Sequence, residues 1–215
     1  MNALQKAMTC WGKPKRIRMD NGSPWGTQTS LPSALSLWLV GLGIRPVYGR
    51  PRQSTDNAVV ERDHGVLAQW VEVEHCTNFQ DCQRRLEWAV VTQRERYRSP
   101  KGYSRAQAFP DLFTNPRTYT PQQDLQQWSS DRVATYLSNF IFHRKVEING
   151  RITLFANGYF LGKRYIRQVI QVRFDPLTYE WIFTDEQSRF ICRHATKELT
   201  YAQISQLQLA KRRRH

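Results

Sequence analysis

The chain has 215 residues, of which 40% are hydrophobic and 12% aromatic, and this excludes a disordered sequence. Its 32 Lys and Arg residues against 18 Asp and Glu residues give a formal net charge of +14, which indicates a polyanionic partner. No apolar run reaches the roughly 18 residues of a membrane-spanning helix, and no signal-peptide pattern is present, so we expect a soluble intracellular protein without a membrane partner.

The first half of the chain predicts alternating helices and strands. Residues 1–10 have the apolar spacing of a helix, and residues 15–20 (KRIRMD) predict a short strand that ends in an acid. Residues 31–42 predict an amphipathic to buried helix, and residues 43–48 predict a second strand. A later helix is expected at about residues 79–97. This order of elements is typical of an α/β fold.

Between the second strand and that later helix, a polar loop leads into another helix. Thr55 or Asp56 is expected to act as its N-cap. The second turn of this helix presents Glu61, and we expect Val59 and Val60 to be buried beside it. Such burial would hold the Glu61 carboxylate against the sheet.

The second half predicts a connector and then a β-rich region. Prolines interrupt any periodicity across residues 99–127. Hairpin-type turns are expected at Asn149-Gly150 and Asn157-Gly158, with strands at residues 165–174 and 181–184. Five or so short strands predict a small barrel, which a short helix follows.

Basic residues concentrate in this β-rich half. The segment from residue 144 to 173 holds seven cations and one acid, and the C-terminal tail adds four cations. Clustered cations with aromatic neighbours are typical of nucleic-acid binding, so we expect a nucleic acid as the partner. The candidates are Arg144, Lys145, Arg151, Lys163, Arg164, Arg167, Arg173, Lys211, Arg212, Arg213 and Arg214.

Two carboxylates are the candidates for chemistry. Asp20 ends the first strand and precedes the tight turn Asn21-Gly22, which projects its carboxylate above the edge of the sheet. Glu61 follows after one helix and one further strand. Each pattern alone also fits an ordinary turn or a solvated helix residue. Together they suit Mg²⁺, although a two-metal phosphoryl-transfer site needs a third carboxylate on another strand.

These segments resemble the second half of the catalytic core of bacterial DDE transposases and retroviral-type integrases. The resemblance implies a ribonuclease-H-like fold that cuts and joins DNA through 3′-hydroxyl attack, with Mg²⁺ or Mn²⁺ bound by Asp, Asp and Glu. Asp20 matches the second Asp and Glu61 the Glu, each as a catalytic and metal-binding residue. The matching segments are residues 12–14, 20–24, 42–46 and 57–62, with further similarity at 97–100 and 104–110.

The C-terminal part resembles the small β-barrel of Mu-type transposases, which is similar to an SH3 barrel and contacts DNA. The expected fold class is therefore α/β, an incomplete ribonuclease-H-like core, followed by a small all-β SH3-like barrel. The expected divisions are a partial catalytic core at 1–120, a linker at 121–140, a DNA-binding barrel at 141–205 and a basic tail at 206–215.

The first Asp of the family has no counterpart, because Asp20 is the first acid in the chain. We therefore expect an N-terminally truncated member that binds double-stranded DNA at the bacterial nucleoid, is inactive alone, and assembles with a full-length transposase or with itself. The alternative is a non-catalytic DNA-binding module that modulates a full-length transposase. An RNA-binding or ribosome-associated protein fits the charge alone but gives no reason for the arrangement of Asp20 and Glu61.

Overall fold

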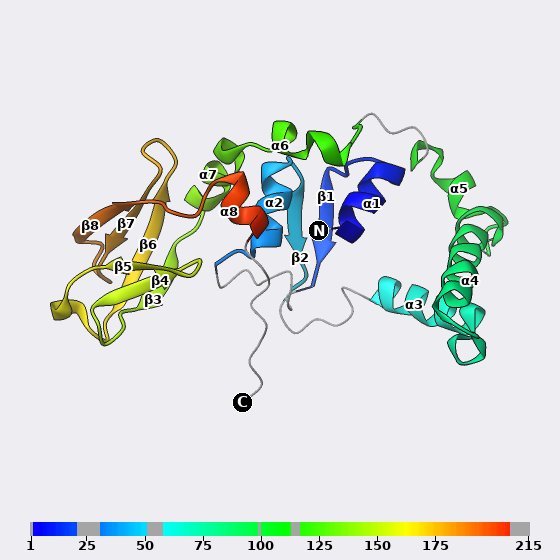
Figure 1. Ribbon diagram of the computed structural model, residues 1–215, viewed down its shortest axis with the longest axis horizontal. Helices are drawn as coiled ribbons and strands as arrows, with labels where there is room; N and C mark the ends of the chain where they lie inside the picture. Colours follow the sequence, from blue (N-terminus) through cyan, green and yellow to red (C-terminus); the bar gives the residue numbers. More distant parts are fainter. Residues whose placement is uncertain (1, 21–30, 51–57, 99, 113–116, 207–215) are drawn as a thin grey trace. The chain divides into compact units, whose positions relative to one another are not determined.

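The computed structural model shows a mixed α/β segment and a β-rich segment (Figure 1). It divides into two compact units, each of which is described by itself. Unit 1 comprises residues 1–5, 14–48 and 119–215, and unit 2 comprises residues 6–13 and 49–118. The residues that the structure describes are 2–20, 31–50, 58–98, 100–112 and 117–206.

The α/β segment of unit 1 is a strand–helix–strand unit. Strands β1 (Arg16–Met19) and β2 (Arg45–Tyr48) pair in parallel, and helix α2 (Ala34–Gly41) connects them. The hydroxyl of Ser33 caps α2 by accepting a hydrogen bond from the Ser36 amide at 3.1 Å. Every residue of α2 after Ala34 is buried, because a helix that is apolar all round must be covered on all sides. The predicted α/β alternation is confirmed.

Four further helices contribute to unit 1. Helix α7 packs against α2, and α8 packs against α2 as well. The four helices are α1 (Asn2–Trp11), α6 (Asp124–Gln127), α7 (Ser130–Ser138) and α8 (Tyr201–Gln206). Helix α1 begins in unit 1 and continues into unit 2. In its described part, the predicted connector at residues 99–127 contains irregular segments and short helical segments, none of them longer than four residues.

A buried carboxylate, that of Asp124, joins four segments of unit 1. Its Oδ2 accepts hydrogen bonds from Trp38 Nε1 and Tyr201 Oη, both at 3.0 Å, and from Gln5 Nε2 at 3.3 Å. Its Oδ1 accepts one from Tyr119 Oη at 2.9 Å. Because only 2% of Asp124 is exposed, these donors must replace the water that burial removes.

The β-rich segment of unit 1 contains a four-stranded antiparallel sheet in the order β3-β6-β7-β8 and a separate hairpin, β4-β5. Alternate residues of β6 and β7 are buried, so one face of the sheet forms a core. The strands are β3 (Phe142–Lys145), β4 (Arg151–Leu154), β5 (Asn157–Phe160), β6 (Val169–Asp175), β7 (Glu180–Thr184) and β8 (Phe190–Ala195).

A second buried carboxylate, that of Glu198, joins the hairpin to the sheet. Its Oε2 accepts hydrogen bonds from Tyr159 Oη at 2.7 Å, the Lys197 amide at 2.9 Å and Asn157 Nδ2 at 3.3 Å. Its Oε1 accepts one from Trp181 Nε1 at 3.1 Å. Burial raises the pKa of the Glu198 carboxyl above its ordinary value, although these donors act in the opposite direction.

The turn of the β4-β5 hairpin differs from the prediction. Phe155 and Ala156 form it with φ angles of 47° and 67°, and the predicted turn residues Asn157-Gly158 instead begin β5. The prediction was wrong because the pairing of buried Ile152 with buried Tyr159 fixes the register, and this outweighs the turn preference of Asn-Gly.

Strand β6 also begins later than the predicted residue 165. Residues Lys163–Tyr165 form a 3-10 turn, and Arg167 has a φ of 67°, which is incompatible with an extended strand. The strand predicted at residues 181–184 is confirmed as β7, and the turn at Asn149-Gly150 is confirmed with Gly150 at a φ of 74°.

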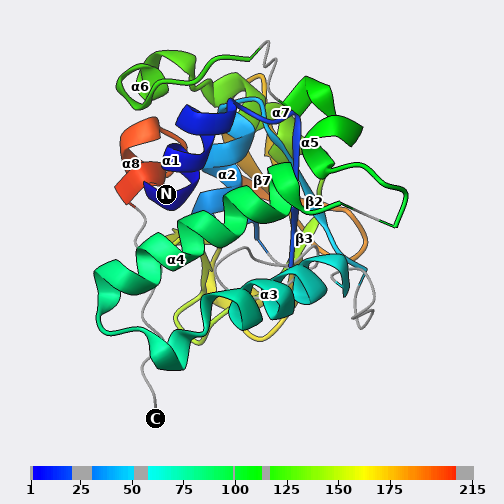
Figure 2. The same cartoon turned by 90° about the vertical axis from the view of Figure 1, so that its right-hand side faces the viewer.

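Unit 2 is helical in its described part (Figure 2). Helix α3 (Ala58–Val71) packs against α4 (Phe79–Val91), with the rings of Trp70 and Trp88 6.4 Å apart. A π-helical turn, Thr92–Arg96, continues α4. The short helix α5 (Arg105–Ala108) begins with a capping box in which Ser104 and Gln107 exchange hydrogen bonds.

The predicted burial of Val59 and Val60 is wrong. These side chains are 74% and 51% exposed, because α3 meets α4 through later residues such as Trp70 and Val71 rather than through its first turn. The predicted N-caps Thr55 and Asp56 lie outside the described residues.

Substituting Gly41 by Ala should destabilise unit 1. A Cβ at Gly41 would lie 1.9 Å from Nε1 of Trp128, so the indole must move, at a cost of about 1–3 kcal/mol. Gly65→Ala is the matched control, because nothing lies within 4 Å of a Cβ there and helix propensity favours Ala by about 0.5–1 kcal/mol. Thermal unfolding should show opposite shifts for the two variants; the same sign for both would contradict this packing.

The stability of unit 1 should depend on pH through Glu198. Because burial raises its pKa in the folded state, its stabilising contribution is present below the ordinary value of 4.5 and is lost as the pH rises through the folded-state pKa. The free energy of unfolding of the wild type minus that of Glu198→Gln, measured by chemical denaturation, should therefore fall with rising pH. Glu186→Gln, at an exposed position, controls for the loss of one charge. A difference that does not change with pH would contradict the raised pKa of Glu198.

Candidate functional site

Asp20 directly follows β1 at the carboxyl end of the β1-β2 pair in unit 1, where Met19 pairs with Tyr48. Met19 is buried and Asp20 is exposed, as the alternation of side chains along a strand requires. The hydroxyls of Tyr48 and Ser36 are 2.7 Å apart and tie the end of β2 to α2. The structure thus places Asp20 at the end of a strand, and the predicted turn after it lies outside the described residues.

Glu61 lies in unit 2 on α3, and it is exposed. The residues directly before Ala58 lie outside the described ones, and Glu61 is in the first described turn of α3. An acid in the first turn interacts favourably with the positive end of the helix dipole. Its neighbour Asp63 forms a bidentate ion pair with Arg105, with nitrogen–oxygen distances of 2.7 and 3.0 Å, and this pair ties α3 to α5.

The two candidate carboxylates belong to different units, so the structure describes the surroundings of each one and does not define a site made of both. Within the described ranges, no three His, Cys, Asp or Glu side chains form a cluster suited to a metal ion. Carboxylates are the ligands that Mg²⁺ and Mn²⁺ prefer. The two candidate residues therefore have the type of ligand that these ions bind, but a two-metal site needs a third carboxylate.

The basic candidates of the β-rich segment converge at one end of the sheet. Arg167 donates its amide hydrogen to the Val146 carbonyl at 3.0 Å, and Val146 donates to the Gln168 carbonyl at 2.9 Å. The end of β3 therefore lies beside the segment that leads into β6. The turn at Gly150 lies against the segment between β5 and β6, because its carbonyl accepts the Leu161 amide hydrogen at 2.9 Å.

These backbone contacts bring together five exposed cations, which we call the basic end. The guanidinium of Arg164 lies 4.7 Å from the centre of the Tyr165 ring, a cation–π contact that orients this side chain. The nearby acid Glu147 accepts a hydrogen bond from Thr153 at 2.8 Å. The basic end consists of Lys145, Arg151, Lys163, Arg164 and Arg167.

The other basic candidates have different surroundings. Arg144 pairs with buried Ile170 and so lies on the inner side of the sheet, where desolvation lowers the pKa of its guanidinium. Arg144 is thus less available to a phosphate than the basic end. Arg173 is exposed on the outer face, opposite Ile182. The tail candidates at residues 211–214 lie outside the described residues.

Sequence reasoning missed Arg193, which lies on the same outer face. Arg193 pairs with Ile182 across β7 and β8, and Ile182 in turn pairs with Arg173. Its guanidinium forms an ion pair with Glu180 at 3.3 Å. The period-two alternation along residues 190–195 could have placed it there, had the strand been assigned.

No protein-family model matches this chain. Within the described part, no helix is both long and apolar enough to cross a membrane.

Proposed function

We propose that this chain is part of a DNA transposition or integration protein of the DDE strand-transfer family, and that alone it binds duplex DNA without transferring strands. In this proposal, the α/β segment is an incomplete ribonuclease-H-like core and the β-rich segment is an SH3-like barrel. The observation that carries the DNA-binding part is the basic end, where backbone hydrogen bonds hold the end of β3, the Gly150 turn and the segment before β6 together and bring five exposed cations into one region.

The basic end suits the backbone of duplex DNA for electrostatic reasons. Each cation that neutralises a phosphate releases a condensed counterion, and this gain is independent of base sequence. Arg and Lys side chains on rigid turns also lose less freedom on binding than those on a free tail. Arg173 is a further exposed cation on the outer face of the sheet, whereas the charge of Arg193 is balanced there by Glu180.

The α/β segment supports the strand-transfer family through Asp20. Its carboxylate stands at the carboxyl end of a parallel strand pair, where open α/β sheets bind their ligands. In the proposed site, Asp20 and Glu61 would provide carboxylate oxygens to Mg²⁺ or Mn²⁺, whose role would be to stabilise the attacking and leaving oxygens of phosphoryl transfer. Two carboxylates hold such ions poorly, so the chain alone is proposed to lack this activity.

The second candidate function is a non-catalytic DNA-binding module that modulates a full-length transposase by mixed assembly. It is favoured by the position of the basic end, which lies entirely in the β-rich segment and includes neither Asp20 nor Glu61. The two candidates share DNA binding and differ in whether the two carboxylates take part in chemistry.

Neutralising three cations of the basic end should reduce the salt dependence of DNA binding. For Lys163→Gln, Arg164→Gln and Arg167→Gln combined, the slope of log affinity against log salt should fall in magnitude by about 0.9 per lost phosphate contact. The matched control is Lys6→Gln, Arg84→Gln and Arg96→Gln, an equal charge change at exposed positions of unit 2. Fluorescence anisotropy with a labelled duplex measures the slope for both triple variants. An equal fall of the slope in both would contradict DNA binding by the basic end.

The two carboxylates should be irrelevant to DNA affinity. Asp20→Asn combined with Glu61→Gln should change the dissociation constant for duplex DNA by less than about twofold, because it removes no phosphate-binding cation. Purified wild-type chain with Mg²⁺ or Mn²⁺ should yield no strand-transfer product on a gel. Metal-dependent transfer that Glu61→Gln abolishes would show that the chain is an active enzyme.

A further inference from the structure

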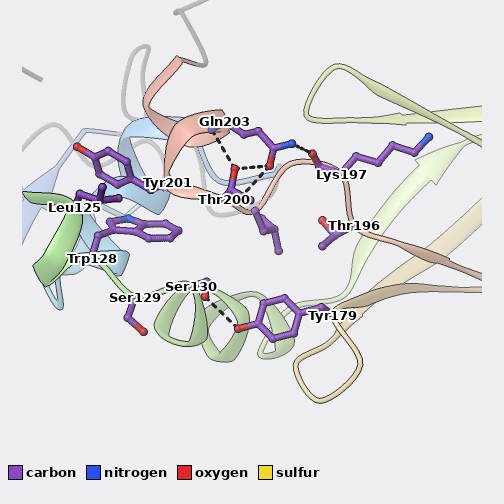
Figure 3. Close-up of a pocket in the computed structure, with 11 residues that line it drawn as sticks. Leu125, Trp128, Ser129, Ser130, Tyr179, Thr196, Lys197, Thr200, Tyr201 and Gln203 are labelled. Atoms are coloured by element: carbon purple, nitrogen blue, oxygen red, sulfur yellow. Dashed lines mark hydrogen bonds between the residues drawn. The ribbon is translucent and has the colours of Figure 1, made fainter.

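A pocket of about 650 Å³ opens on unit 1, and none of the functional candidates above lines it (Figure 3). Its walls come from α6 and the start of α7, from the turn between β6 and β7, and from the segment after β8 together with α8. The lining residues are Leu125, Trp128, Ser129, Ser130, Tyr179, Thr196, Lys197, Leu199, Thr200, Tyr201 and Gln203. Its size lies within the range of about 300–1,000 Å³ that is usual for sites of small ligands.

The aromatic walls of the pocket are held in place by their own contacts. The rings of Trp128 and Tyr201 meet edge to face, with centroids 5.7 Å apart. On another side, the Tyr179 hydroxyl donates to the carboxylate of Asp131. The same hydroxyl lies 3.4 Å from Oγ of Ser130 (Figure 3). Walls that are already ordered bind a ligand without the cost of fixing their side chains.

The chemistry of the lining favours a flat and uncharged ring with hydrogen-bonding groups. The lining contains three aromatic residues and five hydroxyl or amide side chains besides its tyrosines, but no carboxylate. The ammonium of Lys197 lies 5.2 Å from the centre of the Tyr159 ring. Oγ1 of Thr196 has no hydrogen-bond partner within the described part of the chain. A cationic ligand would find no counter-charge in this wall.

We propose that this pocket holds one unpaired base of DNA, placed against Trp128 and Tyr201. The inference rests on the proposed DNA-binding function and adds a substrate class, a duplex with a single-stranded extension. Every base has a π face that stacks on aromatic side chains, and its edge carries donors and acceptors for the surrounding hydroxyls. An apolar peptide side chain would leave those hydroxyls without partners.

The test compares three labelled probes by fluorescence anisotropy: a blunt duplex, the same duplex with a short thymidine extension, and a single-stranded thymidine oligonucleotide. The extended duplex should bind the wild type about tenfold more tightly than the blunt one, which corresponds to about 1.4 kcal/mol. Leu125→Glu should abolish this preference, because it places a carboxylate at an exposed position of the lining, where it repels the sugar–phosphate backbone.

Two controls accompany this variant. Leu125→Gln changes the same side chain without adding charge and should keep most of the preference. Phe79→Glu makes the same change of charge at an exposed apolar residue of unit 2 and should keep all of it. Trp128→Ala, checked for folding by circular dichroism, should also lose the preference, because it removes the main stacking surface.

The outcomes separate this inference from the proposed function. Equal binding of blunt and extended duplexes, or a preference that survives Leu125→Glu, would contradict base binding in the pocket but not the proposed DNA binding. Binding of the single strand alone, weakened by Leu125→Glu, would support the pocket and overturn duplex binding. Binding of no probe would overturn both.

Discussion

The buried carboxylate of Asp124 is the interaction on which unit 1 depends. A carboxylate removed from water is costly unless donors surround it. Here one donor, Tyr119, is near in sequence, and the other three come from distant segments: Gln5, Trp38 and Tyr201. The requirement for these partners fixes the positions of α1, α2 and α8 around α6. Loss of any one donor leaves the buried carboxylate less fully compensated for the water that it has lost.

Glu198 repeats this arrangement in the β-rich segment, again with tryptophan and tyrosine donors. It holds the β4-β5 hairpin and the four-stranded sheet together at the end of β8. The basic end is carried by the strand pairings and turns that this core supports. In the proposed function, a polar interaction inside the core therefore supports the segment that carries the DNA-binding cations.

The sequence predicted the elements whose residues agree in pattern and turn chemistry, such as β1, α2, β2 and the position of Asp20 after a strand. It failed where tertiary contacts outweigh local preference. The Asn157-Gly158 turn yielded to the pairing of Ile152 with Tyr159. The inner position of Arg144 follows from the β3-β6 register, which composition cannot reveal. The pocket at Trp128 was unpredictable for the same reason, since its walls come from segments far apart in the chain.

The bond between Tyr201 and Asp124 has a consequence for biosynthesis. Helix α2 is synthesised before α8, and the carboxylate that holds its Trp38 acquires a last donor only when α8 has been made. Until then, Asp124 has three of its donors, and α2 has α7 against it but lacks α8. A nascent chain would thus keep an apolar helix partly uncovered until α8 is made, and chaperones bind such surfaces.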